Sequence, residues 1–387
     1  MAHRILVSAG EASGDLYASQ LVETLRRQLP DAEFFGCAGP RMRAAGVRPV
    51  ALAENLSVVG LLEVIAHIPR VYREFRKMVR AARTERPDLA ILTDSPDFHL
   101  RLAARLKRAG VPVVYLVAPQ VWAWRKGRIR AIRWNIDRLL CIFPFEEDFF
   151  RRQGVAAIYI GHPLAGIIRA SAAREAFFDL HGFDRSIPLV ALLPGSRRGE
   201  AFRHLPYLLE AAERIRASGK VQFALGSPQG FWRSEDGRIR ARLEAAGISV
   251  LEGQSWDLLA HADLALAASG TVTVEAALLG TPMVTYYRVS QATWQLGRRL
   301  VDVPYYSMVN LVAGRKLVPE LIQNEMSGET LAAEAVRLLK DAEARESMRA
   351  GLAEVAARLR GEADPMQKAA VVVQQLLCNS KGASYVA

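Results

Sequence analysis

The sequence predicts an α/β protein with two doubly wound parallel sheets, and three observations carry that prediction. The chain has 387 residues, more than one hydrophobic core ordinarily organises. Short runs of Val, Ile and Leu alternate with amphipathic helical segments, which is typical of βα units whose strands are buried on both faces. This alternation stops near residue 165 and restarts near residue 188, so we expect one domain on each side of that interval.

The first half contains six apolar runs that we expect to be strands, most of them followed by a helical segment. They are RILVSA (4–9), EFFGCAG (33–39), DLAILTD (88–94), VPVVYLVAP (111–119), RLLCIF (138–143) and AIYIGHP (157–163).

The second half repeats the pattern with five further runs and ends in a charged helical segment. The runs are PLVALLPGS (188–196), KVQFALGSP (220–228), ISVLEG (248–253), ADLALAASG (262–270) and TPMVTYYRV (281–289). We expect domains at residues 1–170 and 171–350, followed by a helical tail at 351–387. Ligands of such sheets bind at the carboxyl ends of the strands, so the function is expected in the loops that follow strands, in a cleft between the two domains.

The composition favours an anionic partner. Lys and Arg number 51 against 40 Asp and Glu, a formal net charge of +11, which attracts nucleotides, phospholipid surfaces or nucleic acid without choosing among them. Cys37, Cys141 and Cys378 are few and widely spaced, and we expect buried, reduced thiols of a cytoplasmic protein. No secretory signal or membrane-spanning stretch is visible, so any membrane association is expected to be peripheral.

Two loops of the second domain have the character of anion-binding turns. In LLPGSRRGE (192–200), Gly195 and Ser196 end a strand, and Arg197 and Arg198 follow at the start of a helix. Backbone N–H groups and guanidinium groups in this arrangement suit a phosphate. A solvated turn with surface arginines is the alternative.

The second such loop is ASGTVTVEAALLGTP (268–282), where Ser269 and Gly270 precede a helix that Thr271 is expected to cap. Glu275 lies one helical turn further on and suits the hydroxyls of a ribose, although a carboxylate near a helix start also satisfies the helix dipole. Together the two loops indicate a nucleotide diphosphate site. Neither is a Walker loop and no G-x-G-x-x-G occurs, which disfavours ATPases and dinucleotide oxidoreductases.

The first domain carries a candidate base. Asp94 ends a predicted strand and Asp97 follows in the loop, so Asp94 is placed to take a proton from an attacking hydroxyl. Capping of the next helix by Ser95 or Asp97 is the alternative for those two residues. A metal is not indicated, because no His or Cys is clustered with the carboxylates.

A further loop, SAGEASGD (8–15), has small residues that let a ligand approach the backbone, but it also carries two carboxylates. We expect Glu11 to accept hydrogen bonds from sugar hydroxyls and Asp15 to cap the following helix, with Ser13 and Gly14 as candidates for a phosphate contact.

Tryptophans and arginines follow another predicted strand of the first domain. Trp122, Trp124 and Arg125 suit sugar rings or anions, whereas core tryptophans beside a basic helix are the alternative, which we accept for Trp134.

The segment 56–83 combines an apolar part with a basic part. Val58, Val59, Leu61 and Leu62 form an apolar patch, and Pro69 is expected to start a second helix. That helix carries Arg70, Arg73, Arg76, Lys77, Arg80 and Arg83. This combination fits docking on an anionic bilayer, but a buried helix followed by a solvated basic one fits the periodicity equally well.

These segments, taken in order, resemble the lipid-A-disaccharide synthase family over nearly the whole chain. The matching motifs are GEASGD, GPRM, VVGLLEV, DSPDFHLRLA, PQVWAWR, GHPL, LLPGSR, ASGTVTVEAALLGTPMV, NLVAGR and VPELIQ. The spacing of Glu275, Gly280 and Pro282 alone is similar to the wider class of GT-B glycosyltransferases. The GT-B fold has two Rossmann-like domains facing across a cleft, and its tail helix crosses back to the first domain.

The resemblance implies an inverting, metal-independent glycosyltransferase of lipid A biosynthesis that needs no cofactor and has no nucleic-acid partner. It would transfer 2,3-diacylglucosamine from UDP-2,3-diacylglucosamine to 2,3-diacylglucosamine 1-phosphate, giving a β-1,6 disaccharide 1-phosphate and UDP. It further implies a cytoplasmic enzyme peripheral to the anionic inner membrane of a Gram-negative bacterium, and it allows an oligomer.

The resemblance also implies roles for individual residues. Asp94 would be the general base. The diphosphate would bind to Arg197, Ser269, Gly270 and Thr271, the ribose to Glu275, and Asn310 and Gln323 would complete the donor pocket. The acceptor would lie against Glu11, Ser13, Gly14, Asp97, Trp122 and Arg125.

Two alternatives remain. One is another GT-B enzyme that uses UDP-N-acetylglucosamine, such as a peptidoglycan transferase or an epimerase, for which the apolar patch would have no purpose. The other is a two-lobed binding protein, against which the base opposite a nucleotide site argues.

Overall fold

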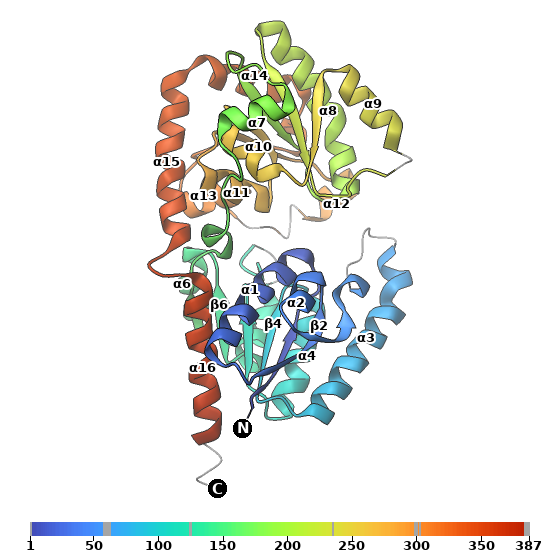
Figure 1. Ribbon diagram of the computed structural model, residues 1–387, viewed down its shortest axis with the longest axis vertical. Coiled ribbons are helices and arrows are strands. Elements are labelled where there is room, and N and C mark those ends of the chain that lie inside the picture. The colour runs from blue at the N-terminus through green and yellow to red at the C-terminus, as the bar shows by residue number, and fades with distance from the viewer. Residues whose placement is uncertain are drawn as a thin grey trace. The chain divides into compact units, whose positions relative to one another are not determined.

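The computed structural model describes residues 2–56, 63–123, 126–233, 236–297, 301 and 303–382. The chain divides into two compact units (Figure 1). Unit 1 comprises Met1–Gly166 and Leu359–Ala387, and unit 2 comprises Ile167–Arg358.

Among the described residues, unit 1 contains a parallel sheet of seven strands in the order β3-β2-β1-β4-β5-β6-β7. The strands are β1 (Arg4–Ser8), β2 (Glu33–Ala38), β3 (Arg48–Leu52), β4 (Leu89–Thr93), β5 (Val113–Leu116), β6 (Arg138–Cys141) and β7 (Ala157–Tyr159). The central strands β1, β4 and β5 are buried almost throughout, as expected of a sheet that helices cover on both faces.

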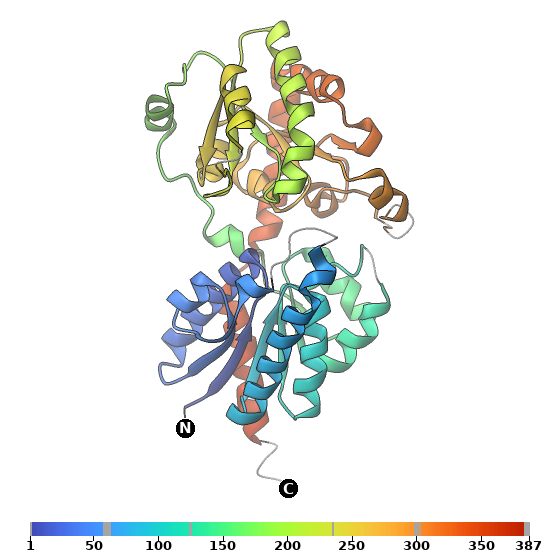
Figure 2. The ribbon, with the colours of Figure 1, turned by 90° about the vertical axis from the view of Figure 1, so that its right-hand side faces the viewer.

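The helices of unit 1 connect these strands and pack on the sheet. They are α1 (Ala12–Gln28), α2 (Pro40–Ala44), α3 (Glu63–Glu85), α4 (Pro96–Arg108), α5 (Ile129–Asn135), α6 (Pro144–Arg152) and α16 (Pro365–Gly382). Proline at the first helical position starts α2, α4 and α6, where its missing N–H is not needed. Helix α3 packs against α4, as Figure 2 shows, and α16 packs against α1.

Unit 2 contains, within the described ranges, a parallel sheet of six strands in the order β10-β9-β8-β11-β12-β13. The strands are β8 (Leu189–Leu193), β9 (Gln222–Ser227), β10 (Ile248–Glu252), β11 (Leu264–Ala268), β12 (Met283–Tyr287) and β13 (Glu320–Ile322). The helices are α7 (Arg174–His181), α8 (Arg198–Ser218), α9 (Gly237–Ala245), α10 (Ser255–His261), α11 (Thr271–Leu279), α12 (Gln291–Gly297), α13 (Met308–Ala313), α14 (Gly328–Lys340) and α15 (Ala342–Arg360).

Both sheets reverse their strand order at one point, between β1 and β4 in unit 1 and between β8 and β11 in unit 2. The chain leaves these neighbouring strands toward opposite faces, so the loops that follow them border an opening at the edge of the sheet. Ligands of doubly wound sheets bind at this switch point. The four loops that the sequence singled out there are those after β1, β4, β8 and β11.

Several local predictions are wrong. Pro69 lies inside the single helix α3 and does not start a second one. Trp134 is 64% exposed and is not a core residue. Cys378 is exposed, whereas Cys37 and Cys141 are buried as predicted. The edge strands β3 and β13 were not predicted. No helix in the described part of the chain is long and apolar enough to cross a membrane.

Candidate active site

The two switch-point loops of unit 1 meet at the side chain of Asp94. The residue directly follows β4, and its carboxylate accepts a hydrogen bond from the N–H of Gly10 at 2.8 Å and another from the N–H of Glu11 at 3.0 Å. Gly10 and Glu11 follow the neighbouring strand β1 and lead into α1. The carboxylate therefore occupies the start of a helix, where backbone N–H groups favour negative charge.

The glycines of the loop after β1 leave room for this carboxylate. A Cβ atom on Gly14 would lie 1.7 Å from Oδ2 of Asp94, and one on Gly10 would lie 2.4 Å from Oγ of Ser95. Both distances are shorter than real contacts, so any side chain at Gly14 would displace Asp94. The small residues of SAGEASGD thus serve the chain's own carboxylate.

The backbone around Asp94 is strained and held in place. Asp94 and Ser95 both have positive φ angles, 53° and 36°, which residues other than glycine seldom adopt. The carbonyl oxygen of Asp94 accepts hydrogen bonds from the hydroxyl of Tyr115 and from Nδ1 of His99, the latter at 2.9 Å. Strain of this kind persists where the surroundings fix it, and it concentrates at functional sites.

His99 is a positioning residue that the sequence reasoning missed. Burial lowers its pKa to about 4, so the ring is neutral. Because a carbonyl can only accept, Nδ1 carries the proton, and Nε2 accepts from the hydroxyl of Ser8 at 2.7 Å. The ring thereby links β1 to the backbone of Asp94. Its place in a helix, five residues after Asp94, gave no signal for this contact.

The environment tunes Asp94 toward base chemistry. The pKa of its carboxyl is raised to about 8, chiefly by burial and in smaller part by the charge of Glu11, against the lowering effect of the hydrogen bonds from the N–H groups of Gly10 and Glu11 and from Ser95. The side chain keeps 12% of its surface exposed. A carboxyl group with a pKa near the working pH, open to a substrate on one side, is suited to general base catalysis.

The other predicted residues of this region are placed differently. Glu11 and Ser13 are exposed at the start of α1, beside Asp94. Asp15 lies within α1 and does not cap it; instead its carboxylate accepts from the N–H of Arg41 at 2.9 Å and of Met42 at 3.1 Å, and so caps α2.

Neither of the residues proposed to cap α4 does so through its side chain. Ser95 stands at the N-cap position without a side-chain hydrogen bond to the helix, and its hydroxyl bonds to Asp94 instead. The carboxylate of Asp97 is exposed and forms an ion pair with Arg128.

Trp122 is a buried part of the fold. Its indole N–H donates to Oε1 of Glu146 at 3.0 Å, and the N–H groups of Ile142 and Phe143 donate to the other oxygen of the same carboxyl. Glu146 is fully buried, which raises its pKa to about 7. Trp122 therefore positions α6 and the loop after β5 rather than offering its ring to solvent. Arg125 lies outside the described residues.

In unit 2, the two predicted anion-binding loops follow neighbouring strands. Residues of β8 and β11 pair directly, Leu193 with Ala267, so the loops after these strands lie at the same edge of the sheet. Arg197 is exposed at the N-cap of α8. Arg198 is held by the fold, because its guanidinium binds Asp236 through a hydrogen bond of 2.8 Å and stacks over Phe202.

The loop after β11 opens onto the start of α11. The N-cap residue is Gly270, so the prediction that Thr271 caps this helix is wrong; Thr271 is its first residue. In the described part of the chain, the N–H groups of Gly270 and Thr271 have no hydrogen-bond acceptor. The hydroxyl of Ser269 donates to the carbonyl of Tyr306 at 3.0 Å, which fixes the loop against the segment before α13. Two exposed N–H donors at a helix start can bind an anion.

Glu275 follows one turn into α11 and is half-buried. Burial raises the pKa of its carboxyl to about 7, and a hydrogen bond from the side chain of Trp256 opposes that rise. Such a carboxyl can accept hydrogen bonds from vicinal hydroxyls when it is ionised.

Asn310 and Gln323 are occupied by the fold. The amide of Asn310 donates to the carbonyl of Val318 and to Glu320, and it accepts from the N–H groups of Leu317 and Val318. Its hydrogen-bonding capacity is thus used in full. Gln323 is buried, and its amide exchanges two hydrogen bonds with the backbone of Val289. Both residues hold the loops that flank β12 and β13.

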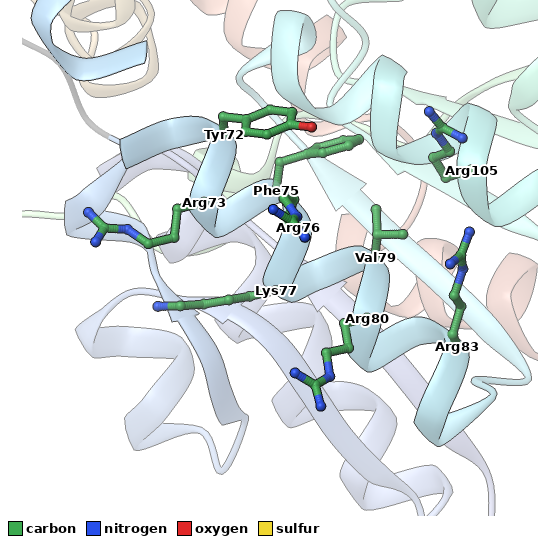
Figure 3. A pocket seen from close by; sticks show the side chains of 9 residues that line it. All are labelled: Tyr72, Arg73, Phe75, Arg76, Lys77, Val79, Arg80, Arg83 and Arg105. Atoms are coloured by element: carbon green, nitrogen blue, oxygen red, sulfur yellow. The ribbon is translucent and has the colours of Figure 1, made fainter. Parts of the chain in front are cut away.

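The basic face of α3 is exposed as the sequence suggested. Figure 3 shows Arg73 and Lys77 extending to one side of the helix, whereas Tyr72 and Phe75 point toward Arg105 of α4. The apolar patch Val58, Val59, Leu61 and Leu62 lies outside the described residues. Within the described ranges no group of three His, Cys, Asp or Glu side chains is arranged to hold a metal ion.

The sequence is similar to curated proteins of one family. A family profile described as "Lipid-A-disaccharide synthetase" matches residues 5–373. A relative from Solibacter usitatus (strain Ellin6076), named "Lipid-A-disaccharide synthase", is 60% identical over 374 residues, 97% of both chains.

Solved structures share the architecture at low sequence identity. A UDP-GlcNAc 2-epimerase from Neisseria meningitidis bound to UDP-GlcNAc superposes with a TM-score of 0.64 at 10% identity, over 97% of this chain and 99% of that one. The calicheamicin glycosyltransferase CalG4 gives a TM-score of 0.58 at 16% identity, over 97% and 98%. These likenesses confirm the predicted GT-B fold, with its two parallel-sheet α/β units.

Proposed function

Because the chain belongs to the lipid-A-disaccharide synthase family, a family of glycosyltransferases, we propose that it joins two diacylated glucosamines. The donor is UDP-2,3-diacylglucosamine, the acceptor is 2,3-diacylglucosamine 1-phosphate, and the products are the β-1,6 disaccharide 1-phosphate and UDP. The observation that carries this proposal is the carboxyl of Asp94, held at a helix start with its pKa raised to about 8.

Asp94 acts as the general base. Its carboxylate takes the proton of the acceptor 6-hydroxyl while the oxygen attacks C1 of the donor sugar. The bond between C1 and the diphosphate oxygen breaks, and its electron pair leaves with UDP. One displacement inverts C1 and gives the β linkage, so no covalent nucleophile is needed.

The loops of unit 2 hold the leaving group. The diphosphate binds to the guanidinium of Arg197 and to the loop formed by Ser269, Gly270 and Thr271, whose N–H groups favour the charge that develops on the leaving oxygen. Glu275 accepts from the ribose hydroxyls. Asn310 and Gln323 act through the backbone segments that they hold, because their own amides are bonded within the fold.

The acceptor binds on unit 1 around Asp94. Glu11 and Ser13 are exposed beside the carboxylate and form hydrogen bonds with the sugar hydroxyls of the acceptor, while Gly14 leaves room for the Asp94 carboxylate itself. Asp97, which pairs with Arg128, also contacts the acceptor, and Arg125, outside the described residues, is proposed as a further acceptor contact. Trp122 supports this region from the interior.

We further propose that the enzyme works at the cytoplasmic face of an anionic membrane. Both substrates carry acyl chains, and the exposed arginines of α3 suit anionic head groups. Co-sedimentation with phosphatidylglycerol vesicles tests this: Arg73→Glu with Arg80→Glu should reduce the bound fraction, while phosphatidylcholine vesicles bind neither protein. Equal binding of both proteins to the anionic vesicles contradicts it.

A second candidate function is transfer from UDP-N-acetylglucosamine. The similarity to the epimerase bound to UDP-GlcNAc is a similarity of fold, and it gives this candidate no support beyond that. The distinction lies in the acyl chains of the donor.

In the experiment, the protein is incubated with the lipid acceptor and either UDP-2,3-diacylglucosamine or UDP-N-acetylglucosamine in separate reactions. The product is identified by mass spectrometry. We expect a tetraacyl disaccharide 1-phosphate from the first donor and no product from the second. A diacyl disaccharide from UDP-N-acetylglucosamine would establish the second candidate instead.

A further inference from the structure

A groove between α3 and α4 begins at the loop that carries Asp94. Its volume is about 890 Å³, within the range of ligand-binding clefts. Glu11, Ser95 and Asp97 line the end beside Asp94. From there the groove follows the two helices away from the carboxyl edge of the sheet, because both helices run from that edge toward the opposite one.

The middle of the groove is apolar. Its apolar lining comes from Val71 and Phe75 of α3 and from Phe98 and Ala104 of α4, together with Leu56. Phe75 and Phe98 meet edge to face with their ring centres 5.6 Å apart, an arrangement that fixes both rings. An apolar groove next to a polar catalytic loop suits a molecule with a hydroxylated head and an alkyl tail.

One rim of the groove is cationic. Arg101, Arg105 and Arg108 also line it, and their spacing of four and three residues places them on the same side of α4. Figure 3 shows Tyr72 and Phe75 pointing toward the helix that carries Arg105. Among the residues that the structure describes, no carboxylate pairs with these three arginines, so their charge is available to an anionic ligand.

We propose that this groove binds an acyl chain of the acceptor and that the arginines on its rim neutralise the acceptor's phosphate. This inference rests on the proposed function, since it assigns a place to the lipid part of that acceptor. The continuity of the groove with the Asp94 loop favours the acceptor over a bystander phospholipid, because a chain in the groove brings its own sugar hydroxyls to the base. The length of the groove then selects the length of the acyl chain.

The test combines substitutions that narrow the groove with acceptors that differ in the length of their acyl chains. Val71→Trp fills it from α3 and Ala104→Phe fills it from α4, where both residues are half-buried. Val371→Trp is the matched control: Val371 is exposed on α16, which packs against α1. Each protein is assayed with acceptors that carry butyryl or tetradecanoyl chains, in one nonionic detergent without phospholipid, after its melting temperature is measured.

We expect both groove variants to lower kcat/KM for the tetradecanoyl acceptor by at least about tenfold and for the butyryl acceptor by less than about twofold, which is the discrimination that apolar pockets reach. Val371→Trp should leave both values unchanged. An equal loss with both acceptors, or no loss with either, overturns the inference. A selective loss that appears only after phospholipid vesicles are added also overturns it, because the occupant is then a membrane lipid.

Direct binding separates this inference from the proposed function. Calorimetric titration of the two acceptors should give weaker binding of only the tetradecanoyl acceptor to the groove variants. If the wild-type protein forms no disaccharide but the groove variants bind only the tetradecanoyl acceptor more weakly, the proposed function fails and the groove stands. If it forms the disaccharide but the variants bind both acceptors as the wild type does, the groove fails and the function stands.

Discussion

The loop after β1 in unit 1 and the loop after β11 in unit 2 both present backbone N–H groups at the start of a helix, but the two sets of N–H groups differ in what they bind. Each follows a buried strand at the switch point of its sheet, and each leads into a helix. In unit 1 the N–H groups of Gly10 and Glu11 bind the chain's own Asp94. In unit 2 the N–H groups of Gly270 and Thr271 have no acceptor in the described part of the chain.

The difference teaches that an anion-binding loop need not bind a ligand. A helix start favours an anion whatever its source. Where the fold supplies the anion, the result is a positioned carboxylate with a perturbed pKa, and the loop becomes part of a base. Where the fold leaves the donors open, the loop keeps its capacity for a phosphate.

The largest effect is expected from removing the base. Asp94→Asn keeps the shape of the side chain but cannot take a proton, so kcat for disaccharide formation should fall about 10³-fold, the range of general base catalysis. UDP-sugar binding, measured by calorimetry, should change little, because the donor loops belong to unit 2. Asp97→Asn is the control and should cost far less. Wild-type turnover by Asp94→Asn would remove the base assignment.

The pH dependence follows from the same carboxyl. Only the ionised form is a base, and its pKa lies at about 8, so kcat/KM should rise about tenfold per pH unit up to that pH and then level off. The folded chain keeps a proton between pH 4 and 8 that the unfolded chain releases. This group therefore disfavours folding increasingly as the pH rises through that window. A pH profile with its acid limb near pH 4 would contradict the shifted pKa.

A pair of glycine substitutions compares the two loops directly. Gly14→Ala places a Cβ atom 1.7 Å from Oδ2 of Asp94, whereas a Cβ atom on Gly270 meets nothing within 4 Å. We expect Gly14→Ala to reduce kcat about 10²-fold through the displaced base, and to lower the melting temperature. Gly270→Ala should keep the melting temperature and raise only the KM of the donor. Equal effects of the two substitutions on kcat would erase the distinction between the loops.

The smallest effect is expected from substituting the arginines that follow β8. Arg197→Gln should raise the KM of the UDP-sugar about tenfold, the worth of one charge-assisted hydrogen bond. Arg198→Gln, which breaks the ion pair with Asp236, should lower the melting temperature instead. A raised donor KM in Arg198→Gln with normal stability would exchange the roles of the two arginines.

The strands buried on both faces could be predicted because they are continuous apolar runs. The edge strands β3 and β13 could not, since RPVAL and ELI each contain a charged residue, are mostly not buried and are no continuous apolar runs. The position of Asp94 at the end of a strand could also be predicted from the sequence. Its contacts with Gly10 and Glu11 could not, because they join segments more than 80 residues apart that meet only when β1 pairs with β4.

The predicted roles of polar residues failed where a side chain bonds to the backbone of a distant segment. Asn310 and Gln323 resemble ligand-binding amides in sequence, yet their partners are backbone groups around β12 and β13. Asp15 looks like a cap of its own helix, yet it caps α2. Local patterns carry the propensity of a residue but not the partner that the topology brings to it.

Because α16 belongs to unit 1, unit 1 begins before unit 2 in the sequence but is completed after it. Unit 1 includes residues 1–166, but α16, which packs against α1 and in which Ala369, Ala370 and Val373 are buried, follows unit 2 in the sequence. Unit 2 is complete in sequence before unit 1 is, so the emerging chain can finish its second unit while the first still exposes the apolar face of α1. Such an exposed face during translation is where chaperones and aggregation act.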